Sequence, residues 1–127
     1  MRLKNFSLAY GTQIFKSFSE EPRIRIIHLL FRKKELCISD LEVILDFTQT
    51  KTSRHIAYLK NAGLVSSRKV DQWVIYSIKE EVIDFVGQIF DFLNKDSMLE
   101  KDLETFNIME SNRELSLSKM QQKAWRT

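Results

Sequence analysis

The chain has 127 residues, of which 43% are hydrophobic and 29% charged, enough for one globular domain with its own core. Three glycines and one proline beside nine phenylalanines indicate a mainly helical chain and exclude an all-β fold. The net charge of +3 permits binding to a polyanion without requiring it. A single cysteine excludes an internal disulfide. Because neither a signal-peptide pattern nor a long apolar run occurs, we expect a cytoplasmic protein with no membrane partner.

Apolar residues at helical spacing predict two helices at the start of the chain. The first runs from about Leu8 to Phe18. Pro22 favours the first turn of the second helix, over roughly 22–32, and His28 is expected on its surface.

Two N-cap signals predict the next pair of helices. Ser39 is the expected cap of a short helix ending near Leu45. Thr48 is the expected cap of a longer helix over 49–61, which stops where Gly63 can adopt the left-handed conformation. Only three residues separate the two helices.

After this glycine, β-branched and aromatic residues predict a hairpin over 66–76 with its tip at 70–72. From Glu80 to Leu93 the helical period returns. Its apolar residues cover about half of the helix circumference, which suggests contact with both the chain's own core and a second copy.

A weaker helical pattern follows over 98–109, and its apolar edge of Leu99, Leu103 and Phe106 could extend a dimer interface. The chain then turns polar and basic and is expected to be loose. We therefore predict a domain over 1–96 and a helical extension with a flexible tail over 97–127.

This order of elements is that of a winged helix-turn-helix, a mainly α fold with a small β-hairpin (α+β). The helix at 49–61 would enter the major groove of double-stranded DNA, with Thr52, Ile56 and Leu59 facing inward. Gln suits adenine, Arg suits guanine, and basic wing residues suit the backbone or minor groove. The predicted DNA-binding residues are Gln49, Thr50, Lys51, Ser53, Arg54, Arg68 and Lys69.

Four stretches also resemble one protein family: "FSEEPRIRIIHLL", "ELCISDLEVIL", "TQTKTSRHIAYLKNAGLVSSRK" and "WVIYSI". They are similar, in order and almost without gaps over roughly 8–94, to the ArsR/SmtB family of dimeric bacterial repressors. The resemblance implies a homodimer formed through the first and last helices, an operator with imperfect two-fold symmetry, and release from DNA when an effector binds. It also implies DNA-facing roles for Gln49, Thr50, Ser53 and Arg54, and wing roles for Arg68 and Lys69.

The sequence departs from this family at its metal sites. Many members bind soft metals through two cysteines separated by one residue, but here Cys37 is followed by Ser39 at the second position. Residues 80–96 offer carboxylates without a histidine, a poor zinc site. We therefore expect no metal and no cofactor, and the effector is not identified.

The sequence leaves two other classes of function to consider beside DNA binding. A winged helix can also act as a protein-protein interaction module without DNA binding. The basic residues on one side favour a sequence-specific regulator, most simply a repressor. An enzyme is not expected, because two histidines, one cysteine and three glycines assemble no catalytic set or phosphate loop.

Overall fold

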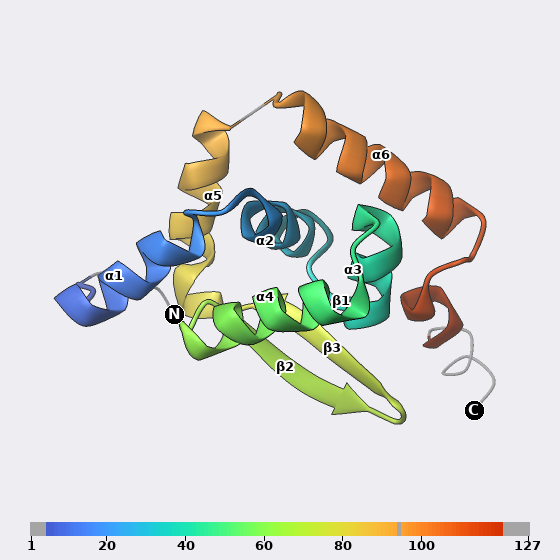
Figure 1. The fold of residues 1–127 in the computed structure, drawn as a ribbon, viewed down its shortest axis with the longest axis horizontal. Helices are drawn as coiled ribbons and strands as arrows, with labels where there is room; N and C mark the ends of the chain where they lie inside the picture. The colour runs from blue at the N-terminus through green and yellow to red at the C-terminus, as the bar shows by residue number, and fades with distance from the viewer. Residues whose placement is uncertain (1–4, 94, 121–127) are drawn as a thin grey trace.

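The computed structural model describes residues 5–93 and 95–120 of the chain. Figure 1 shows a mainly helical fold with one small sheet, which confirms the predicted winged helix-turn-helix. The elements in order are α1 Leu8–Ser17, α2 Glu21–Lys33, β1 Leu36–Cys37, α3 Ile38–Leu45, α4 Gln49–Asn61, β2 Val65–Val70, β3 Trp73–Ile78, a 3-10 turn Glu80–Val82, α5 Ile83–Phe92 and α6 Ser97–Ser111.

The ends of α4 follow the predicted signals. The Thr48 hydroxyl accepts a hydrogen bond from the backbone N–H of Lys51 at 3.1 Å, so the N-cap is confirmed. Gly63 adopts φ +82° directly after the helix, as a left-handed glycine should. The Tyr10 hydroxyl of α1 donates to the Gly63 carbonyl at 2.8 Å, which ties the first helix to the end of α4.

The predicted cap of α3 is wrong by two residues. The helix begins at Ile38, and Cys37 is its N-cap. The backbone N–H of Cys37 donates to the Asp40 carboxylate at 3.2 Å, which satisfies this end of the helix. The Ser39 hydroxyl instead lies 2.8 Å from the hydroxyl of Ser116.

The sheet has three antiparallel strands in the order β1-β3-β2, one strand more than the predicted hairpin. Leu36 of β1 pairs with Tyr76 of β3, which joins the wing to the chain that links α2 and α3. The hairpin tip is also one residue shorter than predicted, because Val70 pairs with Trp73. Asp71 adopts φ +53° in this two-residue turn, a conformation that Asp tolerates.

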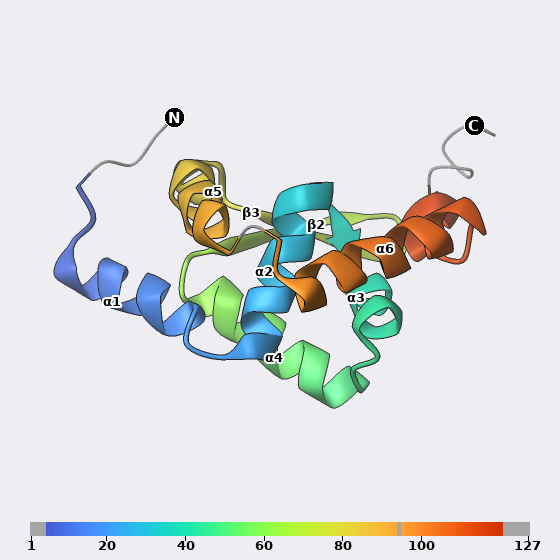
Figure 2. The same ribbon diagram turned by 90° about the horizontal axis from the view of Figure 1, so that it is seen from above.

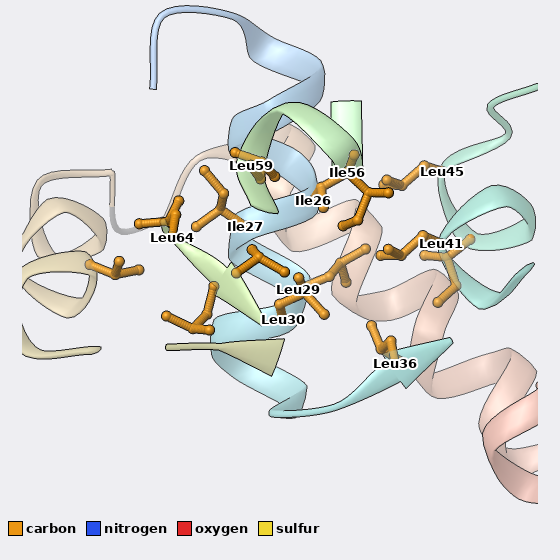
Figure 3. Close-up of a cluster of buried hydrophobic side chains, with 14 of the residues drawn as sticks. Ile26, Ile27, Leu29, Leu30, Leu36, Leu41, Leu45, Ile56, Leu59 and Leu64 are labelled. Carbon is orange, nitrogen blue, oxygen red and sulfur yellow. The ribbon is translucent and has the colours of Figure 1, made fainter. Parts of the chain in front are cut away.

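The core is centred on α2. Figure 3 shows its Ile26, Ile27, Leu29 and Leu30 side chains meeting Leu41 and Leu45 from α3 and Ile56 and Leu59 from α4. Each of these side chains is at most 5% exposed, and full burial of one such side chain is worth about 1.5 to 3 kcal/mol. His28 is buried too, 4.9 Å from the Phe90 ring between centroids, so its predicted surface position is wrong.

The C-terminal helix α6 lies along α2 and α3, as Figures 1 and 2 both show. Its Leu99 and Phe106 are buried against the chain's own core, so this edge is not available to extend a dimer interface as predicted.

The segment after α6 was expected to be loose, and for residues 112–120 this is wrong. Backbone N–H groups of Ser116 and Leu117 donate to the Asp40 carboxylate at 2.6 and 3.2 Å, and Leu115 is 1% exposed. The rest of the predicted tail, 121–127, lies outside the described residues. The division between 1–96 and 97–127 stays a prediction.

Candidate nucleic-acid interface

The solvent face of α4 carries the residues chosen from the sequence. Thr52, Ile56 and Leu59 are buried, as predicted, which leaves the opposite face of the helix outside. The predicted contact residues on this helix divide into exposed Gln49, Thr50 and Arg54 and half-buried Lys51 and Ser53. The first turn also presents backbone N–H groups and the positive end of the helix dipole, a suitable arrangement for a phosphate.

The inner face of α4 carries the buried imidazole of His55, and its Tyr58 ring packs against the buried Arg23 of α2. His55 is 3% exposed, and burial, followed by the nearby Arg54 charge, lowers its pKa below the ordinary value. The Arg23 guanidinium lies 4.1 Å from the centre of the Tyr58 ring and donates to the Lys16 carbonyl at 2.7 Å. Arg23 therefore connects α4 to the junction of α1 and α2, and this contact orients the exposed face of α4.

Lys51 is less free than the sequence suggested. Its Nζ lies 4.1 Å from the centre of the Phe47 ring, close enough for a cation-π interaction. Phe47 belongs to the turn between α3 and α4, beside Asp46 in the left-handed conformation. Phe47 is not among the residues predicted from the sequence to act in DNA binding. A large aromatic residue inside a three-residue turn was the available signal.

The wing places Arg68 and Lys69 on β2, both exposed. Arg68 is paired with Glu35, since its Nη2 and Nε donate to one carboxylate oxygen at 2.6 and 3.0 Å. The sequence did not reveal Glu35, which is 33 positions away and is brought here by the pairing of β1 with β3. Because β2 packs against α4, the wing lies next to this helix.

Cys37 occupies the first of the two cysteine positions that the family resemblance implies, and its thiol is buried. Burial, followed by the charge of Asp40, raises the pKa of the Cys37 thiol to about 11, so it is protonated at neutral pH. Across residues 5–93 and 95–120, no group of three or more His, Cys, Asp or Glu side chains is placed to hold a metal ion. In the same part of the chain, no helix has the length and apolar character that crossing a bilayer requires.

Comparisons with known proteins agree with this geometry. The family model described as "Bacterial regulatory protein, arsR family" matches residues 20–67, which hold α2, α3 and α4. The "Arsenical resistance operon repressor" of Escherichia coli K12 is 39% identical over 79 residues, covering 62% of this chain and 68% of the relative. The "Cadmium resistance transcriptional regulatory protein CadC" of Listeria innocua is 38% identical over 78 residues, covering 61% and 66%. The chain thus spans about two thirds of the length of these relatives.

Solved structures show the same fold. HlyU from Vibrio cholerae superposes with a TM-score of 0.61 at 29% identity, covering 66% of this chain and 91% of that one. The homodimeric winged helix-turn-helix DNA-binding domain of a possible ArsR-family regulator from Mycobacterium bovis has a TM-score of 0.63, covering 69% and 82%. Its identity of 21% supports a common fold and no more.

Proposed function

We propose that this chain, which belongs to the arsR family of bacterial regulatory proteins and is a DNA-binding winged helix-turn-helix regulator of transcription, is a homodimeric, cytoplasmic repressor. The observation that carries the proposal is the exposed face of α4 beside the basic strand β2. Repression would follow from occupation of the operator. A reporter gene placed behind the operator distinguishes repression from activation, because deletion of a repressor should raise the expression of the reporter.

In this proposal α4 enters the major groove. Gln49 and Arg54 would contact base edges, because their paired hydrogen-bonding groups match adenine and guanine. Thr50, Lys51 and Ser53 would contact phosphates or neighbouring base edges. Arg68 and Lys69 on the wing would bind the backbone or the minor groove and contribute affinity more than specificity.

The dimer would form through α1 and α5, which lie next to each other at one end of the fold (Figures 1 and 2). Leu8 is 88% exposed and Phe15 64% exposed on α1, and Phe92 is 89% exposed on α5. A groove of about 540 Å³ lies between the two helices, lined on its apolar side by Phe6, Leu8, Phe15 and Phe85. Large apolar side chains exposed together are typical of an interface.

The dimer is tested by sedimentation of Phe15→Glu. A buried charge at the interface should convert the dimer to a monomer and weaken DNA binding with it. Phe15→Glu chains that sediment as the unmodified protein does would contradict this placement of the interface.

The signal that releases the protein from DNA is proposed not to be a soft metal bound by a cysteine pair. The relatives are named for arsenic and cadmium resistance, but soft-metal sites use several thiolates, and Cys37 is a single, buried thiol. Arsenite or Cd²⁺ should therefore leave DNA binding unchanged in an anisotropy titration. Release from DNA by either would contradict the proposal.

DNA binding is tested by fluorescence anisotropy with the duplex upstream of the protein's own gene and a scrambled duplex of equal length, across a salt series. We expect tight, salt-sensitive binding that prefers the native duplex, at two chains per site. Arg54→Ala should reduce the preference, whereas Lys101→Ala, which removes an exposed charge on α6, should leave it unchanged. Equal weak binding to both duplexes would leave two explanations: an operator elsewhere, or the alternative function, an interaction module without DNA binding.

A further inference from the structure

Helix α6 lies outside the helix-turn-helix, yet one of its carboxylates is buried against α2. Asp102 is 2% exposed. Its two oxygens accept hydrogen bonds from Nε and Nη2 of Arg25 at 2.9 Å each, across 77 positions of sequence. Such a two-point contact fixes the orientation of the guanidinium as well as its position.

Arg25 continues the contact toward the DNA-binding turn. Its guanidinium carbon lies 5.2 Å from the centre of the Phe47 ring, and Lys51 Nζ lies 4.1 Å from the centre of the same ring. Phe47 thus contacts a cation from α2 and a cation from the first turn of α4. We call the series Asp102, Arg25, Phe47 and Lys51 the α6–α4 relay.

A second contact ties the C-terminal extension to the same unit. The Asp40 carboxylate, at the start of α3, accepts hydrogen bonds from the backbone N–H groups of Ser116 and Leu117. The extension therefore contacts both α2, through Arg25, and α3, through Asp40.

We propose that Asp102 is a positioning residue for DNA binding, acting on the first turn of α4 through the α6–α4 relay. This inference rests on the proposed function, in which that turn contacts DNA. Asp102 fixes Arg25, Arg25 supports the Phe47 ring, and the ring restricts the Lys51 ammonium before DNA arrives. Because the Lys51 side chain is already restricted in the free protein, less conformational entropy is lost when DNA binds, and this raises the affinity for DNA.

The direction of the change in DNA affinity distinguishes a positioning role of Asp102 from a simple effect of its charge. Asp102 is a negative charge in a protein that binds a polyanion. If only its charge mattered, its neutralisation would tighten DNA binding. If Asp102 acts through the relay, its neutralisation loosens the turn and weakens binding. The two explanations predict opposite changes for Asp102→Asn, a substitution that keeps the shape of the side chain.

The experiment compares operator affinity, by anisotropy, for the full chain and three variants at a temperature where circular dichroism shows all of them folded. Asp102→Asn should bind about threefold to tenfold more weakly. Glu104→Gln, the same charge change at an exposed site on α6, controls for charge. Asn107→Ala controls for docking of α6, because it removes the 3.2 Å contact with Lys33 without touching the relay. Both controls should stay close to the unmodified protein.

A double-mutant cycle keeps the proposal testable if Asp102→Asn also lowers stability. In a Phe47→Leu background the relay is already broken, so Asp102→Asn should have little further effect on affinity. Additive losses, or unchanged or tighter binding by Asp102→Asn, would overturn the proposal.

The Phe47 ring resonances in the NMR spectrum of the free protein test the α6–α4 relay independently of DNA binding. They should shift in Asp102→Asn but not in Glu104→Gln. Unmoved resonances overturn the relay whatever the DNA data show. An unmodified protein with no operator preference would instead overturn the proposed function and, with it, the role of Asp102 in DNA binding.

Discussion

The ion pair between Arg68 and Glu35 restrains the wing, and its removal should strengthen DNA binding. The two side chains are 58% and 41% exposed, with 2.6 Å between Nη2 and the carboxylate oxygen. An exposed pair of this kind is worth about 0 to 1 kcal/mol. To bind a phosphate, Arg68 must leave Glu35 or bring the carboxylate close to the phosphate. Glu35→Gln should therefore tighten operator binding by up to about fivefold, the equivalent of about 1 kcal/mol.

The assay is anisotropy from low to moderate salt. With Arg68 released onto a phosphate, the slope of log affinity against log salt should steepen by about 0.9, the value for one added phosphate contact. Glu104→Gln gives the effect of a distant charge of the same sign. In an Arg68→Ala background the gain from Glu35→Gln should disappear. A gain that persists there, or that equals the gain from Glu104→Gln, would refute the reasoning and leave only a long-range field.

Three further predictions follow from individual residues. Arg54→Ala should weaken binding to the operator by about 1 to 3 kcal/mol and should change binding to a scrambled duplex little. Lys69→Ala should weaken binding to the two duplexes equally. Anisotropy measurements on both duplexes distinguish a base-specific contact from a general contact with the DNA backbone. Gly63→Ala should lower the free energy of unfolding, measured in urea, by about 1 to 3 kcal/mol, because φ is +82° and the new Cβ would lie 2.8 Å from the Tyr10 ring. An unchanged free energy of unfolding would contradict this prediction. Burial, and then the charge of Arg32, lower the pKa of His28 below its ordinary value of 6.5, so the unfolded chain takes up the proton first. Stability should be complete above pH 6.5 and fall below it. In denaturant titrations at pH 5 to 7.5, His28→Gln should weaken that dependence and leave the part due to His55, whose pKa is lowered in the same direction.

Local signals in the sequence predicted most of the helix-turn-helix. Thr48 and Gly63 mark the two ends of α4, because capping and left-handed φ are properties of single residues in short segments. The inward side of α4 followed from the spacing of Thr52, Ile56 and Leu59, and with it the exposed candidates opposite.

The features that the sequence did not predict depend on long-range contacts. Strand β1 has two residues, too few for an alternating pattern. Arg25 and Asp102 are 77 positions apart, and neither looks different from an ordinary charged helix residue until α6 is docked. His28 is buried because α2 is covered by α5 and α6 as well as by α4, so no side of that helix is left to solvent at its position.

The hydrogen bond between Tyr10 and Gly63 connects α1, the proposed dimerisation helix, to the end of α4, the proposed recognition helix. An operator must match the relative orientation of these two helices. A dimer on B-DNA places its two recognition helices one helical turn apart, about 34 Å. That separation depends on the angle between the helix that forms the interface and the helix that enters the groove. Here a hydrogen bond of 2.8 Å joins α1 to the residue that ends this chain's recognition segment. In the proposed dimer, half-site spacing would accordingly depend in part on this one hydrogen bond between α1 and the end of α4.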